Sequence, residues 1–363
     1  MSISHRDRSM RRCAAASLGV LLLMATGASG QDLAPDRIRT LVSAEADSAL
    51  ARYRELLSMP NDAHFPEDIG VLTAWVETAF GSRGFETQRL ETPGADLLLA
   101  GRRAPVGPSG MGASEGLPTV LFYLQADGQP VDRSRWFQAD PYGPVLKARG
   151  SDGAWREVAW ESLPAPDPGR PLAGWDPELR IFARSASDSK GPIAQFLAAL
   201  DLLRESGTSQ PYHIKVVVDF EEEMGSPNLP GAVSRNREAL ASDMLVILDG
   251  PPHISGAPSL KFGARGISRF TLTTYGPRVP VHSGHYGNFA PNPALRLAQI
   301  LSSMKDREGR VTIPGFYDGV VLSDETRALL DSVPDDEEAI RDRRGIAQPD
   351  TVAGSHQEAV QIP

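Results

Sequence analysis

Acidic side chains follow predicted buried strands of this chain, a position from which carboxylates can bind a divalent cation. The β-branched run Ile214–Phe220 leads directly into the acidic triplet Glu221–Glu223, and a glycine turn follows. Because like charges repel, three adjacent carboxylates gain nothing from burial unless a cation or a raised pKa offsets them. The plain structural alternative for this stretch is a solvated acidic loop, and within the triplet Glu221 is expected to face solvent.

Two other apolar segments end in the same way. Leu121–Gln125 is followed by Asp127, and Met244–Leu248 is followed by Asp249. A further acid, Asp188, lies in a loop that opens a predicted helix. Since α/β proteins place their ligands at the carboxyl ends of parallel strands, these acids are expected to share one edge of a sheet. Several oxygen donors at one edge favour a divalent-metal site over an ordinary acidic edge.

The elements that would position these acids follow from the apolar periodicity. Helices are predicted over Asp32–Met59, Asp68–Phe80, Pro192–Gly207, Gly231–Leu240 and Pro293–Met304, and strands over Glu86–Glu91, Asp96–Ala100, Thr119–Leu124, Ile214–Phe220 and Met244–Leu248. Alternating strands and helices are typical of a largely parallel α/β sheet flanked by helices. Little regular structure is predicted over Pro130–Pro177, and an exposed antiparallel strand is predicted over Gly266–Tyr275.

The amino terminus has the pattern of a cleavable secretory signal peptide. Four arginines precede the apolar run Ala14–Gly27, and a small-residue site ending at Gly30 follows it. Cleavage before Gln31 would leave a mature chain without cysteine, because Cys13 is the sole cysteine of the 363 residues. The sequence therefore predicts a secreted or periplasmic protein without a stable membrane anchor, whose metal ligands are oxygen and nitrogen.

The mature chain is also predicted to be more acidic than the full sequence. The formal charge of −9 becomes −12 once the four arginines and Asp7 are removed. Acidic proteins are repelled by phosphate backbones, so nucleic acid is not expected as a partner. With 363 residues and 41% hydrophobic side chains, two domains are expected.

The acidic triplet and the loop around Asp188 resemble one enzyme family. That family comprises co-catalytic zinc metallopeptidases, including carnosinase-type dipeptidases, aminoacylases such as acetylornithine deacetylase, and succinyl-diaminopimelate desuccinylase. The similar segments are Leu124–Val131, Ala183–Pro192, Glu221–Leu229, Leu248–Gly266, His282–Gly284, Asn292–Pro293 and Gly315–Asp318. The resemblance implies a catalytic domain over residues 31–260, after the signal peptide 1–30. It also implies an inserted α+β lid and dimerisation domain over 261–363.

The resemblance also implies roles for single residues. Asp188 would bridge two zinc ions, while Glu223 and Asp249 would each hold one of them. Glu222 would be the general base, and His282 would help to stabilise the oxyanion across a dimer interface. Two cations lower the pKa of a bridging water, and a nearby free carboxylate takes its proton.

Two departures from the family pattern accompany this resemblance. The family's first motif is His-x-Asp, whereas this chain has Gln125 at the metal-ligand position and Asp127 at the position that orients the ligand. Asp127 is therefore expected to hydrogen-bond the Gln125 amide in place of an imidazole. An amide oxygen is a weaker zinc donor than imidazole, so Mn²⁺ or Co²⁺ stands as an alternative to Zn²⁺. The sequence ends at Pro363, inside the expected lid, and a truncated member lacking the family's final metal-binding histidine is therefore expected.

The function implied by the resemblance is metal-dependent hydrolysis of peptide or N-acyl amide bonds. Small peptides or N-acyl amino acids would be the substrates, with Arg265 and Asn292 in contact with them. A hinge or ion-pair role is an equal alternative for Arg265. The second hypothesis is a catalytically impaired homologue that binds a peptide or a single metal ion without turnover, and Gln125 favours it.

Overall fold

The computed structural model describes residues 34–104, 116–164, 176, 178–208, 210–250, 259–263, 266–333 and 335–362. The predicted signal peptide and the predicted substrate residue Arg265 lie outside these residues. The chain divides between residues 251 and 252 into two units, and the assignment of 261–363 as a lid stays a prediction. In the described part of the chain, no helix is long and apolar enough to cross a membrane.

The first unit is built on a five-stranded mixed sheet, which confirms the predicted α/β class. Its strands are β1 (Glu86–Leu90), β2 (Leu97–Arg102), β3 (Thr119–Gln125), β7 (His213–Asp219) and β8 (Met244–Ile247), in the order β1-β2-β7-β3-β8. β3 pairs in parallel with both β7 and β8, whereas β2 pairs antiparallel with β1 and β7. The parallel half is the part that bears the acids. Strands β1 and β2 form an antiparallel hairpin because a short turn, Glu91–Asp96, joins them.

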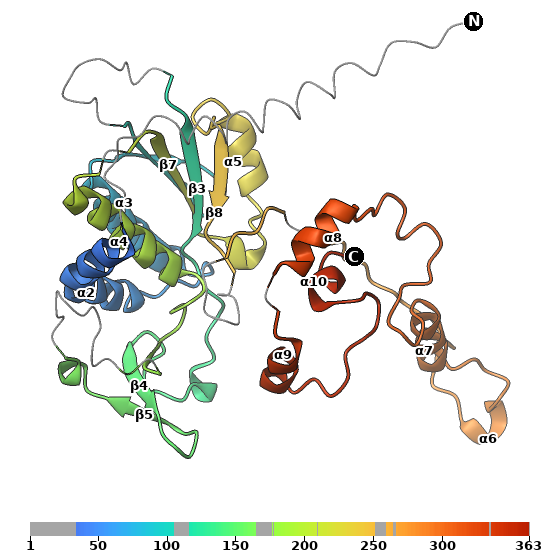
Figure 1. Ribbon diagram of the computed structural model, residues 1–363. Coiled ribbons are helices and arrows are strands. Elements are labelled where there is room, and N and C mark those ends of the chain that lie inside the picture. The colour runs from blue at the N-terminus through green and yellow to red at the C-terminus, as the bar shows by residue number, and fades with distance from the viewer. Residues whose placement is uncertain are drawn as a thin grey trace, which may run out of the picture. The chain divides into compact units, whose positions relative to one another are not determined.

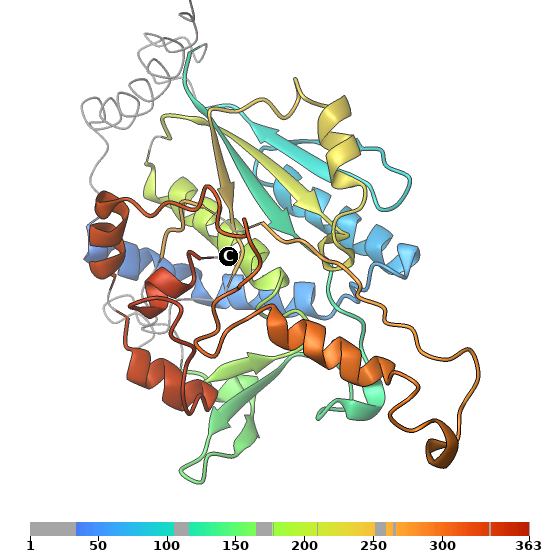
Figure 2. The ribbon, with the colours of Figure 1, turned by 90° about the vertical axis from the view of Figure 1, so that its right-hand side faces the viewer.

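Helices cover both faces of this sheet (Figures 1 and 2). The helices are α2 (Pro35–Leu57), α3 (Pro66–Gly81) and α4 (Lys190–Ser206) on one face, and α5 (Leu229–Arg235) on the other. Val216 and Val218 belong to the core beneath α3 and α4, whereas Val217 packs in the cluster beside α5. Strand β7 is therefore buried on both sides, as its continuous apolar run predicts.

A second, three-stranded antiparallel sheet contradicts the prediction of little regular structure over Pro130–Pro177. It consists of β4 (Val145–Arg149), β5 (Trp155–Val158) and β6 (Arg180–Phe182), in the order β5-β4-β6, with one-turn 3-10 helices at Arg133–Arg135 and Trp160–Ser162. Trp155 packs edge-on against Phe182 with 5.2 Å between ring centroids. These strands hold three to five residues each, too few to show a period, and the third lies far along the chain.

The second unit contains α6 (Ser283–Tyr286), α7 (Pro293–Ser303), α8 (Asp324–Asp331), α9 (Glu337–Arg344) and α10 (His356–Ala359). Helix α7 forms where it was predicted, and Asn292 caps it by accepting from the backbone N–H groups of Ala294 and Leu295 at 3.0 and 3.2 Å. The strand predicted over Gly266–Tyr275 is wrong, since these residues have no strand assignment. Ile267, Phe270 and Tyr275 are 79%, 72% and 87% exposed, and no described strand pairs with this segment.

Candidate metal and catalytic site

The carboxyl ends of β3, β7 and β8 lie at one edge of the sheet because the three strands are parallel. Gln125, the last residue of β3, is in register with Asp219, the last residue of β7. The backbone N–H of Leu248 donates to the carbonyl of Tyr123 at 3.1 Å, so the chain continues beside β3 as far as Leu248, the residue before Asp249. The structure thus brings together the strand ends that precede the predicted site residues.

Glu221, the first acid of the triplet, is buried at 7% exposure, so the prediction that it faces solvent is wrong. Its Oε1 accepts from the backbone N–H of Ala95 at 3.1 Å, and its Oε2 accepts from Nδ2 of Asn228 at 2.6 Å. A Cβ on Gly94 would lie 2.1 Å from Glu221 Oε1, so this glycine permits the close approach. Glu221 therefore joins the β1–β2 turn to the turn after β7.

Asp219 is a site-organising residue that sequence reasoning missed. Its carboxylate is 2% exposed and accepts three hydrogen bonds. Oδ1 binds the backbone N–H of Glu221 at 2.9 Å, and Oδ2 binds the hydroxyls of Tyr123 at 2.9 Å and Ser226 at 2.7 Å. The only sequence signal was an acid at the end of an apolar strand. Its bonds hold the one-turn 3-10 helix Glu222–Met224, which ends at Gly225 with φ of 85°.

Glu222 and Glu223, the predicted base and ligand, are half-buried at this turn. Burial raises the pKa of Glu222, and the charges of Glu223, Asp249 and Asp188 raise it further. The backbone N–H of Glu223 donates to Asp127 Oδ2 at 3.0 Å, and Gln129 Nε2 donates to Glu223 Oε2 at 2.5 Å. The triplet therefore divides into one buried structural acid and two acids at the open edge.

Asp127 is fully buried at the end of β3. Burial raises its pKa to about 7, even though the N–H of Glu223 stabilises the charged form. Its Oδ1 has no hydrogen-bond partner in the described part of the chain. The prediction that Asp127 binds the Gln125 amide is therefore wrong, and a buried acceptor is left open next to the predicted metal position.

Asp188 and Asp249 are exposed at the same edge. Burial and the charge of Asp249 both raise the pKa of Asp188, which means that the two carboxylates repel one another. The loop that carries Asp188 is bonded to the end of β3, because the hydroxyl of Ser189 donates to the carbonyl of Asp127 at 2.9 Å. Asp188 thus places an exposed carboxylate on a backbone that is held in position.

The donor chemistry of this edge fits a divalent cation, although no tight ligand set is preformed. Burial, and then repulsion between neighbouring carboxylates, raises the pKa of both Asp188 and Glu222, and a cation would relieve the repulsion. Among the described residues, no group of three His, Cys, Asp or Glu is arranged to hold a metal ion. The histidines described in the first unit are engaged elsewhere, since His64 contacts Asp62 at 2.7 Å and His213 Nδ1 accepts from the N–H of Ala104 at 3.0 Å. The donors at this edge are oxygens.

The predicted residues of the second unit have local roles in the structure. His282 Nδ1 accepts from the N–H of Gly284 at 3.0 Å, and its ring centroid lies 5.0 Å from that of His285. Asn292 caps α7, as described above. Their assignments to oxyanion stabilisation and substrate contact stay predictions, as does the assignment of Arg265.

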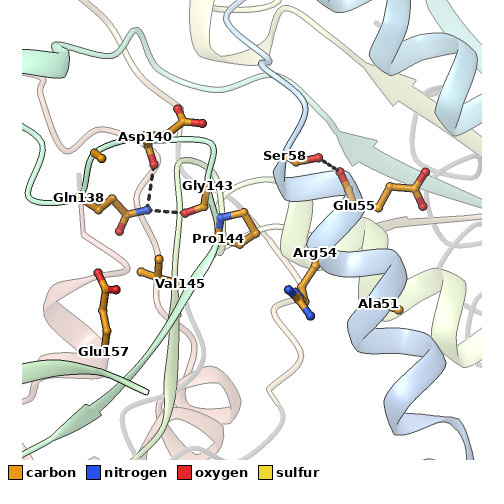
Figure 3. Close-up of a pocket in the computed structure, with 11 residues that line it drawn as sticks. Ala51, Arg54, Glu55, Ser58, Gln138, Asp140, Gly143, Pro144, Val145 and Glu157 are labelled. Atoms are coloured by element: carbon orange, nitrogen blue, oxygen red, sulfur yellow. Dashed lines mark hydrogen bonds between the residues drawn. The ribbon is translucent and has the colours of Figure 1, made fainter. Parts of the chain in front are cut away.

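A surface cavity of about 670 Å³ lies apart from these acids, between α2 and the chain that leads into β4 (Figure 3). Gln138 Nε2 donates to the carbonyls of Asp140 and Gly143 at 3.2 and 2.8 Å, which fixes one wall. On the opposite wall, the guanidinium of Arg54 lies 4.4 Å from the ring centroid of Trp160. None of the predicted site residues lines this cavity.

The chain matches the sequence model of peptidase family M20/M25/M40 over residues 161–325. It is 25% identical to the human Beta-Ala-His dipeptidase over 330 residues, which cover 87% of this chain and 59% of that protein. It is 27% identical to the Cysteinylglycine-S-conjugate dipeptidase of Corynebacterium striatum, covering 85% of this chain and 57% of that protein. The chain thus spans about three fifths of the length of these two relatives.

Solved structures of similar fold lead to the same group of proteins. An M20 family metallo-carboxypeptidase from Sulfolobus solfataricus superposes with a TM-score of 0.60 and 24% identity, covering 87% of this chain and 62% of that one. Human carnosine dipeptidase 1 superposes with a TM-score of 0.58 and 20% identity, covering 91% of this chain and 64% of that one. At these identities the likeness shows the fold.

Proposed function

We propose that this chain is a member of the M20/M25/M40 peptidase family, whose sequence model it matches over residues 161–325, and that it is a metal-dependent hydrolase of peptide or N-acyl amide bonds. The observation that carries the proposal is the group of acids at the carboxyl edge of the parallel strands. Asp188, Glu222 and Asp249 come from three separate segments, and the pKa of Glu222 is raised by burial and then by the charges of Glu223, Asp249 and Asp188. Such repulsion is expected where a cation normally lies between the groups.

In this proposal the acids divide into ligands and a base. Asp188, Glu223 and Asp249 hold the cation, with Zn²⁺ as the first candidate and Mn²⁺ or Co²⁺ as alternatives suited to oxygen donors. A bound divalent ion lowers the pKa of water and polarises a carbonyl. Glu222 takes the proton at its carboxylate, since a raised pKa brings a carboxylate closer to the neutral range in which a base works best.

Dipeptides are the substrates we propose, because the curated relatives are named as dipeptidases. The activity is proposed for the chain as it stands, which spans about three fifths of those relatives. Oxyanion stabilisation by His282, pairing of two copies through the second unit, and export by the amino-terminal signal are further parts of this proposal. They rest on the family resemblance and on the sequence pattern.

A homologue that binds a peptide or a single metal without turnover is the second candidate. It is favoured by Gln125, which places a neutral amide where the family has an imidazole. The two candidates differ in turnover, and only the hydrolase requires a cation at the acidic edge.

The decisive experiment compares the wild type with Glu222→Gln, using calorimetric zinc titration and hydrolysis of the β-Ala-His and Cys-Gly dipeptides. We expect Glu222→Gln to lose about 10²–10⁴-fold in kcat, the usual contribution of a general base, and to keep its zinc affinity. Glu86→Gln, at an exposed position on β1, is the matched control. Zinc binding by the wild type without hydrolysis would favour the second candidate. No zinc, Mn²⁺ or Co²⁺ binding at all would exclude the hydrolase.

A further inference from the structure

Asn61 is a fully buried polar residue just beyond α2, outside every sequence motif identified above. Its Nδ2 donates to the carbonyl of Ala126 at 2.9 Å and lies 3.0 Å from Oγ of Ser185. Its backbone carbonyl accepts from the N–H of Gly128 at 2.8 Å. One residue therefore contacts both the end of β3 and the loop before α4, which are separated by 59 positions in the chain.

These two segments are the ones that carry predicted ligands. Ala126 lies between Gln125 and Asp127, and Ser185 lies three residues before Asp188. Asn61 is thus bonded to the backbone on one side of the site and to the loop on the other. Among the described residues outside these two segments, no other side chain is seen to bond to both, and the segments also meet directly where the hydroxyl of Ser189 donates to the carbonyl of Asp127 at 2.9 Å.

The loop before α4 is also held to the chain beyond α2 by a second set of bonds, around the buried Lys190. Its ammonium donates to the carbonyl of Met59, two residues before Asn61, and its backbone N–H donates to the carbonyl of Ser185 at 3.1 Å. Because Lys190 is 0% exposed, this ammonium lies in the interior of the protein. The end of α2 therefore serves as the common anchor for both ligand-bearing segments.

Asn61, Gly128 and Ser185 are closely packed against one another. A Cβ on Gly128 would lie 2.2 Å from Oγ of Ser185 and 2.9 Å from Nδ2 of Asn61. Ser185 itself has a φ of 59°, in the left-handed region that non-glycine residues seldom adopt. A displacement of Asn61 would consequently be transmitted to both neighbours.

We propose that Asn61 is a positioning residue, whose carboxamide sets the separation between the Gln125–Asp127 strand end and the Asp188 loop. The proposal rests on the proposed function in that it takes this edge to be the metal site. Partners that orient metal ligands contribute about 10–100-fold in metal affinity. Asn61→Ala would leave the carbonyl of Ala126 and the hydroxyl of Ser185 buried without this partner, and the two segments would separate.

The test combines Asn61→Ala with the matched control Thr73→Ala. Thr73 is also buried, at 4% exposure, but its hydroxyl bonds only to the Ile69 carbonyl of its own helix, at 2.7 Å. Hydrogen exchange of the metal-free proteins is followed in peptides covering 125–129 and 185–190, and zinc Kd is measured by calorimetry. For Asn61→Ala we expect a joint loss of protection in both peptides and a zinc Kd at least about tenfold weaker. Thr73→Ala should change neither.

Unchanged protection in either peptide, or a zinc Kd equal to that of the Thr73→Ala control, would overturn the positioning role. Ser185→Ala removes only the hydroxyl partner and provides the same comparison if Asn61→Ala does not fold. If the wild type binds no zinc, the proposed function fails. The exchange of the metal-free proteins then still supports or overturns the role of Asn61 on its own.

Discussion

Gln125 determines how strongly a cation can be held at the end of β3. We expect Gln125→His to tighten zinc binding by about tenfold or more, because imidazole is a better zinc donor than an amide oxygen. The buried Oδ1 of Asp127, two residues on, has no hydrogen-bond partner among the described residues and is available to an imidazole N–H. Calorimetric titration of the two proteins with zinc measures the difference. Gln88→His, on exposed β1, is the control, and an equal gain in that variant would mean non-specific binding.

Asp127 also predicts how the stability of the metal-free protein depends on pH. Its folded-state pKa of about 7 exceeds its ordinary value of 3.8, so the folded protein holds more protons than the unfolded chain between these pH values. The free energy of unfolding therefore falls as the pH rises through this window, by on the order of 4 kcal/mol at most, at about 1.4 kcal/mol per pKa unit. The raised pKa values of Asp188 and Glu222 act in the same direction.

Asp127→Asn should remove most of this slope and leave a protein that is more stable than the wild type at pH 8. Urea unfolding at pH 5 and pH 8 in the presence of EDTA measures it. Asp152→Asn, at an exposed carboxylate paired with Arg156, is the control. Equal slopes in the wild type and Asp127→Asn would show that the Asp127 carboxylate does not titrate as its burial implies.

At the residue scale, the sequence indicated the acids of the candidate site but not the buried polar residues that hold their segments in place. Glu222, Glu223 and Asp249 were singled out because an acid that follows a predicted buried strand is conspicuous, and Asp188 because it lies in a loop that opens a predicted helix. Asn61 was missed because a single asparagine after a helix carries no periodic signal, and its contacts lie 65 and 124 residues away in the chain. Glu221 was misassigned for the same reason, since its partner Ala95 belongs to a distant turn.

The turn after β7 is the element on which the site depends, and Glu221 links it to the β1–β2 turn. We expect Glu221→Ala to lower the free energy of unfolding by about 2–3 kcal/mol, because it removes two charge-assisted hydrogen bonds and leaves the N–H of Ala95 without that partner. Urea unfolding at neutral pH tests this. Glu86→Ala, at an exposed position of β1, should change stability by less than about 0.5 kcal/mol. A loss of similar size in both variants would contradict the buried role.

Elements with a long apolar period were predicted within a few residues, including α2, α3, α4, β3 and β7. The spacing of apolar residues within one continuous segment shows whether that segment is buried on one face or on both, and this spacing can be read directly from the sequence. The small sheet of β4, β5 and β6 was missed because its pairing joins short strands across a long connection. The strand expected over Gly266–Tyr275 failed because alternation alone does not supply a neighbouring strand.

At the scale of the whole molecule, the proposed ligands Asp188, Glu223 and Asp249 all belong to the first of the two units. Zinc should therefore stabilise that unit selectively, since a ligand stabilises only the structure that binds it. At a free zinc concentration of 100 times Kd the gain in the free energy of unfolding is about 2.7 kcal/mol.

Removal of zinc with EDTA should accordingly increase hydrogen exchange in peptides from β3, β7 and α4, and leave α7 unchanged. Mass spectrometry of both states measures the exchange, and Glu223→Ala with the same EDTA step is the control that should show little response. An equal increase in α7 would mean that the second unit takes part in metal binding, and no increase in β7 would place the metal away from the acidic edge.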